Sequence, residues 1–291
     1  MDYFLAQVTN GLASGSIYAL IAIGYSLVYG VLQLINFAHG DVYMFGTFVA
    51  VALLLTVLPP VLALLVAILV GALLAALVER IAYRPLRDAN RIAPTVSAIG
   101  AALIIRNTAQ KVWGTSTRPF PLHLDAPVIP IFGIGISSIQ VAVFLIAVLL
   151  MLAFDLFIRR SLTGKAMRAV AQDMTAAGYM GIPVNRIVVL VYALGGALGV
   201  AGGILFALNY NTVFVAMGFT GTLKAFIAAV IGGIGNLRGA FLGGLLLGVI
   251  EALAAGYISS GYRDAIAFAV LIVVLLVRPQ GLLGARATNK V

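Results

Sequence analysis

Few side chains in this sequence have the types and spacing that catalysis or metal binding requires. The chain has no cysteine and only two histidines, His39 and His123, so thiol chemistry and histidine-built metal centres are not expected. His39 and Asp41 come closest to a metal-ligand pair, but two ligands do not make a site. Asp41, at the start of an apolar stretch, is better suited to capping a helix. Paired carboxylates, a Ser/His/Asp set and a His-Glu-x-x-His sequence are all missing, and we predict neither a catalytic nor a metal site.

Two glycine-containing stretches resemble nucleotide-binding loops only superficially. Residues 232–239 are glycine-rich, but Arg238 stands where a dinucleotide loop needs its last glycine. Gly164-Lys165 is followed by Ala166, whereas a Walker A loop needs Ser or Thr there. The sequence therefore predicts that the chain itself binds no ATP.

Two charged residues stand inside apolar stretches, where an unpaired charge is costly. One is Arg106, beside Asn107, and the other is Glu251. Glu251 is expected either to pair with a basic group such as Arg263 or to contact the amine of a ligand, and the structural pairing is favoured.

The composition shows which elements must position these residues. Of 291 residues, 63% are hydrophobic and 9% charged, with a mean hydropathy of +1.13; a soluble domain is about 45–50% apolar and about 25% charged. This composition excludes a soluble enzyme, a disordered chain and a disulfide scaffold. The net charge of +9 does not indicate nucleic acid binding, because the basic residues gather at the ends of apolar runs. We predict an all-α polytopic membrane protein, with residues 1–291 forming a single transmembrane domain.

The apolar stretches approach the roughly 20 residues that a membrane-spanning helix needs. They cover residues 12–35, 42–58, 60–83, 92–112, 136–158, 187–208, 222–234, 240–258 and 263–277. The sequence therefore predicts about nine transmembrane or re-entrant helical segments.

Basic residues between these segments predict the sidedness, because Lys and Arg accumulate in cytoplasmic loops. The three clusters are Arg80, Arg84, Arg87 and Arg91; Arg159, Arg160, Lys165, Arg168 and Arg186; and Arg278, Arg286 and Lys290. Placing all three in the cytoplasm requires nine segments, with the N-terminus outside and the C-terminus inside. The alternative is seven spans plus a re-entrant pair formed by 222–234 and 240–258.

Two polar, glycine-containing breaks suggest an internal repeat. The break at 36–41 and the break at 235–239 are each followed by a segment that leads to an Arg-Pro helix end. Interrupted helices at matching positions often line transport pathways. We therefore expect these residues to line the path: Asn36, His39, Gly40, Asp41, Gly235, Asn236 and Glu251. A stripe of small residues, Gly195, Gly199 and Gly203, predicts a close helix crossing.

The segment 159–186 is the longest cytoplasmic stretch and has a helical pattern. Met167, Val170, Ala171, Met174 and Ala177 recur at helical spacing, which predicts a short helix over 164–177. We expect Thr163 to cap its start, and Gly178 and Gly181 to end it. The apolar stripe suits either a membrane interface or a groove on a cytoplasmic partner, and the pattern alone does not decide between them.

Part of this segment resembles the coupling motif of ABC importer permeases, in the version found in branched-chain amino acid permeases. The matching residues are Gly164, Lys165, Ala166, Met167, Arg168, Ala169, Asp173, Ala176, Met180, Gly181 and Ile182. Residues 24–31, 35–41, 231–240 and 278–282 are similar to the same family. The likeness covers nearly the whole chain and is to the smaller of the two permease subunits.

This resemblance implies a complex in the bacterial inner membrane. The chain would form half of a pore for branched-chain amino acids, paired with a second, homologous permease subunit as a heterodimer. Two cytoplasmic ATPase subunits would bind ATP, so the chain would need no cofactor, and each would receive a coupling helix. A periplasmic or lipid-anchored substrate-binding protein would dock outside, near residues 113–135 and 209–221.

Three other functions compete with this one. A permease for urea or short amides belongs to the same family. A passive channel for small solutes is compatible with glycine-rich broken helices, but it leaves segment 159–186 without a role. An ion-coupled transporter usually needs deep carboxylates, and Glu251 is the one carboxylate expected at such depth.

Overall fold

The computed structural model describes residues 2–87, 89–90, 92–122, 127–131 and 134–284. Arg91, His123, Arg286 and Lys290, which the sequence analysis named, lie outside these residues. Within the described part the chain is mostly helical.

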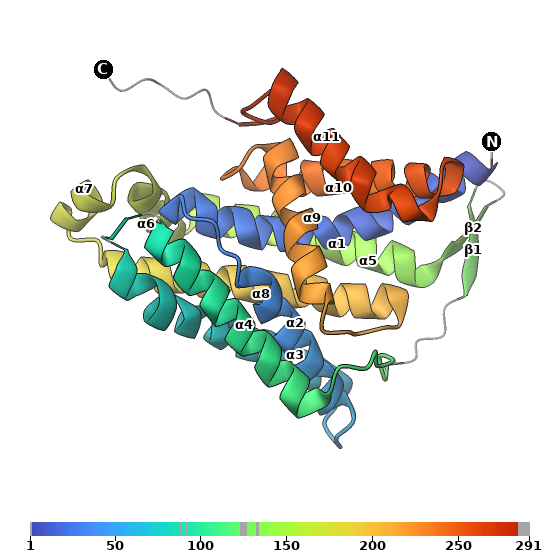
Figure 1. Cartoon of the computed structure of the whole chain (residues 1–291), viewed down its shortest axis with the longest axis horizontal. Coiled ribbons are helices and arrows are strands. Elements are labelled where there is room, and N and C mark those ends of the chain that lie inside the picture. The colour runs from blue at the N-terminus through green and yellow to red at the C-terminus, as the bar shows by residue number, and fades with distance from the viewer. Residues whose placement is uncertain (1, 88, 91, 123–126, 132–133, 285–291) are drawn as a thin grey trace.

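Seven described helices are long and apolar enough to cross a membrane. They are α1 (Asp2–Leu32), α3 (Pro60–Val78), α4 (Ile92–Trp113), α5 (Ser138–Arg160), α8 (Val184–Tyr210), α10 (Leu237–Tyr257) and α11 (Arg263–Val277). Helices α1, α5, α8 and α10 run along the long axis of the molecule, whereas α4 and α11 are inclined to it (Figure 1). The α3 span continues through a π-helical turn (Glu79–Tyr83) and a 3-10 turn (Arg84–Leu86), and the 3-10 turn Ser260–Tyr262 leads into α11.

Two shorter apolar helices complete the set of segments: α2 (His39–Leu54) and α9 (Met217–Gly232). Each of the nine predicted segments thus coincides with an apolar helix, with ends shifted by up to about five residues, except that α1 begins ten residues before the predicted start at 12. Of the two stretches in the alternative re-entrant pair, 222–234 falls in the short helix α9, and 240–258 falls in α10, which is long and apolar enough to cross a membrane.

A small antiparallel hairpin departs from the all-α expectation. Its strands are β1 (Val128–Ile131) and β2 (Ile134–Ser137), within the polar stretch 113–135. The hairpin lies near the N-terminus, at the end of the molecule opposite α6 (Leu162–Gln172) and α7 (Met174–Tyr179) (Figure 1).

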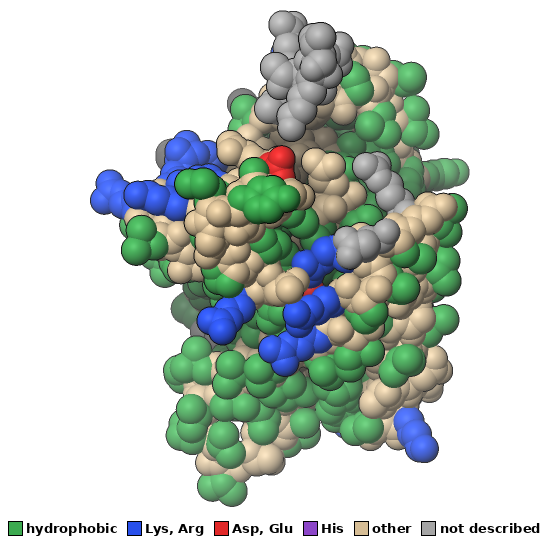
Figure 2. Space-filling view, turned by 90° about the vertical axis from the view of Figure 1, so that its left-hand side faces the viewer, with side chains coloured by type: hydrophobic (Ala, Val, Ile, Leu, Met, Phe, Trp, Pro, Cys, Tyr) green, Lys and Arg blue, Asp and Glu red, His purple; other side chains and the backbone are tan. Residues whose placement is uncertain are grey.

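The exposed basic residues gather at the end that carries α6 and α7. Figure 2 looks onto this end and shows Lys and Arg side chains over its surface. The contributing side chains come from all three predicted clusters and include Arg84, Arg159, Lys165, Arg168, Arg186 and Arg278. An Arg87 Nη1 to Asn185 Oδ1 hydrogen bond of 3.0 Å joins the first two clusters.

Small residues allow the helices at the centre to touch. A Cβ atom added at Gly24 of α1 would lie 2.6 Å from the carbonyl oxygen of Gly195 on α8, and one at Gly195 would lie 2.9 Å from that of Gly24. Further along the predicted stripe, Gly199 faces His39 and Tyr43, and Gly203 faces Tyr43. The close crossing predicted for this stripe is therefore confirmed.

The two short helices, α2 and α9, match each other in length and in the way they begin. Each has 16 residues and follows a long helix that ends in a residue with left-handed backbone, Gln33 (φ 55°) after α1 and Asn211 (φ 50°) after α8. Each also begins at an alanine of similar helical conformation, Ala38 or Ala216. These correspondences match residues 33–38 with residues 211–216, whereas the repeat expected from the sequence matched the break at 36–41 with the break at 235–239.

The pair formed by α1 and α2 is inverted relative to the pair formed by α8 and α9. Along α1, Ile17 and Ile21 face Gly202 whereas Gly24 and Val28 face Gly195, so α1 and α8 run antiparallel. The first turns of α2 and α9 meet at Gly40 and Gly218, whose backbones are in direct contact. Two short helices thus begin at the same place in the core, and α9 crosses the long helices steeply (Figure 1).

Candidate functional site

The expected path residues of the first break lie in the core where α2 begins. His39 Nε2 is 3.2 Å from the carbonyl oxygen of Ile21, and Gly40 packs against Gly218 of α9. Asn36 is buried just before α2, where its Oδ1 accepts hydrogen bonds from the Ala38 N–H and the Tyr83 hydroxyl, each at 3.1 Å.

Asp41 does not cap α2 as predicted. The N-cap residue is Ala38, which has no side-chain capping bond. The carboxylate of Asp41 instead accepts two hydrogen bonds from Arg106 of α4: Nε to Oδ1 and Nη2 to Oδ2, both at 2.9 Å. A carboxylate buried in the core is stabilised more by a bidentate guanidinium than by a helix end, because the opposite charge neutralises it.

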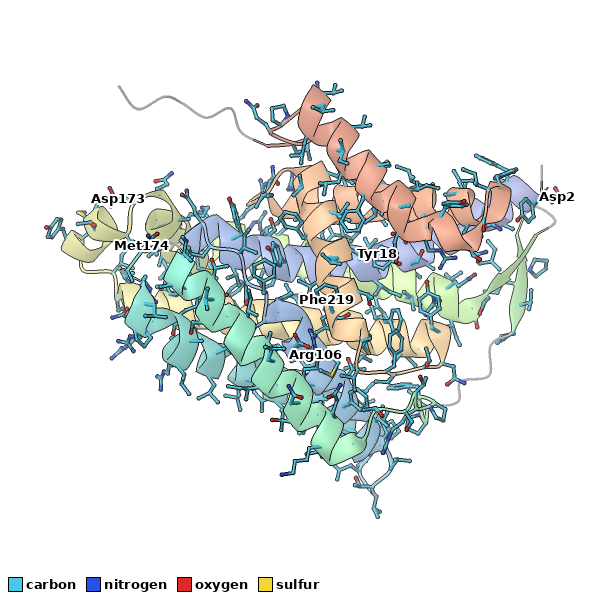
Figure 3. All side chains as sticks on the ribbon, viewed as in Figure 1. Asp2, Tyr18, Arg106, Asp173, Met174 and Phe219 are labelled. Atoms are coloured by element: carbon cyan, nitrogen blue, oxygen red, sulfur yellow. The ribbon has the colours of Figure 1, made fainter. Side chains whose placement is uncertain are left out.

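Arg106 borders a cavity of about 350 Å³, called here the central pocket. Its guanidinium carbon is 5.8 Å from the ring centre of Phe219, in the first turn of α9 (Figure 3). The walls are mainly apolar and come from α1, the 33–38 segment, α4 and α9: Ile35, Phe37, Ile99, Ala102, Leu103, Phe219, Leu223 and Phe226. Tyr25, Arg106 and Thr222 are its polar members.

Glu251, the deep carboxylate of α10, lies elsewhere, toward the end of the molecule that carries the hairpin. The expected salt bridge to Arg263 is replaced by one from Lys224 of α9, whose Nζ is 2.8 Å from Oε2. The Tyr18 hydroxyl donates to the same oxygen at 3.1 Å, and Lys224 also lies 3.2 Å from Asp264. The favoured structural pairing of Glu251 is thus confirmed, with a different partner.

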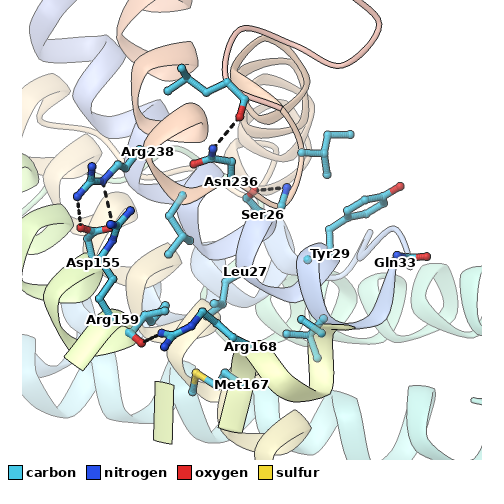
Figure 4. A pocket seen from close by; sticks show the side chains of 18 residues that line it. Ser26, Leu27, Tyr29, Gln33, Asp155, Arg159, Met167, Arg168, Asn236 and Arg238 are labelled. Atoms are coloured by element: carbon cyan, nitrogen blue, oxygen red, sulfur yellow. Dashed lines mark hydrogen bonds and ion pairs between the residues drawn. The ribbon is translucent and has the colours of Figure 1, made fainter. Parts of the chain in front are cut away.

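The second break lies near the basic end, away from the central pocket. Gly235 donates from its N–H to Ser26 Oγ at 2.8 Å, and Asn236 caps α10 by accepting from the Gly239 N–H. Both residues line a cavity of about 660 Å³ with α6 and the end of α5 (Figure 4). Across this cavity, Arg238 Nη2 of α10 is 2.8 Å from Asp155 Oδ2 of α5.

The predicted coupling segment folds as two helices rather than one. The helix over 164–177 was predicted to start at a Thr163 cap, but α6 starts at Leu162 and its N-cap is Ser161, whose Oγ accepts from the Gly164 N–H at 2.9 Å. Asp173 interrupts the helix because its carboxylate accepts from the N–H groups of Thr175 and Ala176, which makes it the N-cap of α7. Helix α7 ends at Tyr179, just before Gly181 with φ +80°.

The apolar stripe of α6 packs inside this chain. Met167 and Val170 are buried in a cluster with Leu27 of α1, Ile158 of α5 and Ile187 of α8. Ala166, Ala169 and Ile182 are partly buried against the same cluster, and Gly164 contacts the backbone of Ile158. Arg168 donates to the Ile158 carbonyl oxygen. The side chains of Lys165 and Ala176 are exposed.

Two large side chains dominate the exposed tip: Met180, which belongs to the matching residues of the coupling motif, and Tyr179, which the sequence analysis did not select. Tyr179 is 88% exposed and Met180 is 83% exposed, at the point of the molecule farthest from the hairpin (Figure 1). Lys224 was also missed, although a lysine inside an apolar segment is the same signal that singled out Glu251. No sequence pattern marks Tyr179 and Met180 as exposed.

Comparison with known proteins completes these observations. The profile of the family described as branched-chain amino acid transport system, permease component, matches residues 7–275. The chain is 41% identical to the high-affinity branched-chain amino acid transport system permease protein BraD of Pseudomonas aeruginosa, over 99% of this chain and 98% of BraD. It is 40% identical, over the same shares, to the corresponding permease protein LivH of Escherichia coli. Among solved structures, PsaBC from Streptococcus pneumoniae in complex with Fab covers 93% of this chain and 91% of its own, with a TM-score of 0.50 and 13% identity, which is a likeness of fold alone.

Proposed function

The chain belongs to the family of branched-chain amino acid transport permeases, and we propose that it forms half of the pore of an ABC importer for these amino acids. The observation that carries this proposal is the 41% identity to BraD, because it extends over 99% of the chain. A match of this length includes both the core helices and the segment proposed for coupling.

The proposed orientation places the basic end in the cytoplasm and the N-terminus outside. The concentration of Lys and Arg at the end bearing α6 and α7 supports it (Figure 2). In this orientation α1, α3, α4, α5, α8, α10 and α11 each span the membrane. Each of the two remaining crossings consists of a non-helical segment followed by a short helix. Residues 33–38 lead into α2, and residues 211–216 lead into α9. The membrane is then the bacterial inner membrane, as expected for importers of this family.

Segment 159–186 is the proposed contact with an ATPase subunit. Tyr179 and Met180 offer exposed apolar surface at its tip, while Lys165 and Ala176 are exposed beside them. Met167 and Val170 hold α6 against α1, α5 and α8, so a force applied at the tip reaches the membrane helices through packed side chains. ATP is bound by the two partner ATPases in this scheme, and this chain carries no cofactor.

The remaining partners are a second, homologous permease subunit and a substrate-binding protein. The end with the N-terminus and the hairpin is the proposed docking surface for the binding protein. The inverted arrangement of α1 with α2 and α8 with α9 suits alternating access, in which packed halves rock around a central site.

Reconstitution of the complete complex in proteoliposomes tests this function. We expect uptake of labelled leucine to require ATP, the binding protein and hydrolysis-competent ATPases. Uptake of urea in place of leucine identifies a urea permease, and equal uptake without the ATPases identifies a passive channel. Either result contradicts the proposal.

A further inference from the structure

The central pocket combines an apolar wall with polar groups that have unused hydrogen-bonding capacity. Asp41 engages Nε and one hydrogen of Nη2 of Arg106, and the other N–H groups of the guanidinium, on Nη1 and Nη2, remain for a second acceptor. These groups form the end-on fork that suits a carboxylate. Arg106 therefore neutralises Asp41 and can bind a second carboxylate at the same time.

A second polar group of the pocket lacks a partner. The Tyr25 side chain is 1% exposed, and its hydroxyl makes no hydrogen bond with any described residue. Buried polar groups are nearly always hydrogen-bonded, and an unmet one costs free energy. The Tyr25 ring is fixed by edge contacts with His39 and Phe226, at centroid distances of 6.1 and 6.0 Å. The oxygen is itself buried, so a ligand group in the pocket becomes its partner when the neighbouring wall side chains shift.

The two short helices favour a negative charge in the same region. Asp41 and Phe219 lie in the first turns of α2 and α9, which meet at Gly40 and Gly218. The N-terminal end of a helix carries partial positive charge, and broken helices in transporters direct such ends at anionic substrate groups. Arg106 thus acts where two helix ends already favour an anion.

We propose that the central pocket binds a branched-chain amino acid on its way through the pore. Its carboxylate binds the Arg106 fork, its ammonium donates to the Tyr25 hydroxyl oxygen, and its side chain packs among Ile99, Leu103 and Phe226. This inference deepens the proposed function and rests on it. The volume of about 350 Å³ suits a small ligand, for which cavities of about 300–1,000 Å³ are usual. Urea has no carboxylate for Arg106.

Cysteine protection tests the site in the assembled complex, because this chain contains no cysteine of its own. A Leu223→Cys variant places a thiol in the pocket wall, and Val57→Cys places a control thiol in the exposed turn between α2 and α3. With leucine at ten times its dissociation constant, we expect maleimide labelling at position 223 to slow about tenfold. Labelling at position 57 and labelling in the presence of urea stay unchanged.

Tyr25→Phe separates a binding role from a structural one. Because the hydroxyl has no partner among the described residues, its removal leaves assembly and thermal stability unchanged or improved. It raises the leucine concentration that gives half-maximal protection about tenfold or more, because a hydrogen bond to a charged group usually contributes that much to affinity. The control is Tyr192→Phe, a second buried tyrosine that packs on Tyr83 and does not line the pocket; it leaves protection unchanged.

The outcomes distinguish failure of the site from failure of the function. Absence of protection in a complex that takes up leucine overturns the site and leaves the proposed function intact. A Leu223→Cys thiol that is unreactive with and without leucine shows that a lipid or the second permease subunit fills the pocket, which also overturns the site. A wild-type complex that takes up no leucine contradicts the proposed function itself.

Discussion

The contact between α2 and α9 makes a specific prediction about Gly40. A methyl group added there would overlap the carbonyl oxygen of Gly218 and the hydroxyl of Thr222. Carbon atoms in good contact are about 3.5–4.0 Å from their neighbours, so the two helices must separate by roughly 1–2 Å. The Thr222 side chain can rotate away, but the Gly218 oxygen belongs to the backbone of α9 and cannot.

The magnitude follows from two opposing terms. Overpacking of a close contact costs about 1–3 kcal/mol, and replacing glycine by alanine within a helix returns at most about 1 kcal/mol. We therefore expect Gly40→Ala to destabilise the chain by about 1–2 kcal/mol. At about 2–4 °C per kcal/mol, the unfolding midpoint of the purified complex falls by roughly 2–8 °C. Leucine uptake also falls, because α9 lines the central pocket and Asp41 of α2 holds Arg106 in its wall.

The assay is thermal unfolding in detergent, followed by tryptophan fluorescence, together with uptake by proteoliposomes. Gly100→Ala is the matched control: Gly100 lies within α4, and an added Cβ atom would meet nothing within 4 Å. Its midpoint should stay constant or rise. The role assigned to the α2–α9 contact is refuted when Gly40→Ala behaves like Gly100→Ala in both measurements.

Three further variants test the charge cluster and the coupling segment. Lys224→Met leaves buried Glu251 without its cation and should cost about 3–5 kcal/mol in thermal unfolding, most of which Glu251→Gln restores in the double variant; an unchanged midpoint in the single variant contradicts this pairing. Asp173→Ala removes the cap of α7 at a cost of about 1 kcal/mol and should lower substrate-stimulated ATPase activity, whereas Asp173→Asn keeps most of it; equal activities refute the capping role. Joint replacement of Tyr179 and Met180 by serine should reduce copurification of the ATPase without lowering the midpoint, and undiminished copurification excludes them from the contact.

The helical segments were predictable because each depends on a local property, a run of apolar residues of the right length. The paths of 33–38 and 211–216 were not, because what distinguishes α2 and α9 is where they begin. Each short helix starts in the core, at a contact between Gly40 and Gly218 that no local pattern encodes. Left-handed residues at Gln33 and Asn211 end the preceding helices; asparagine is a weaker signal of such an end than glycine, and glutamine gives none.

The candidate site was predicted only in part, for the same reason. Arg106 was noticed as a costly charge and Asp41 as a helix cap. Their pairing was not predicted, because it joins α2 to α4 across 65 residues of sequence. The apolar stripe of α6 was detected correctly, and its burial partner was not, because helical periodicity identifies an apolar face without naming what covers it. Met167 lies inside this chain, so Met167→Asp is expected to lower thermal stability as well as coupling.

The packing of α6 explains how motion at the cytoplasmic end reaches the path. Helix α5 runs into α6 through a single residue, Ser161, so α6 cannot shift without moving the end of α5. Asp155 in that end holds Arg238 at the start of α10, within the break at 235–239 that separates α10 from α9. A pull on α6 therefore acts on both helices of this break. Because α9 begins at the central pocket and ends at the break, we expect loss of the Asp155–Arg238 pair to weaken coupling between ATP hydrolysis and uptake while leaving leucine binding in place.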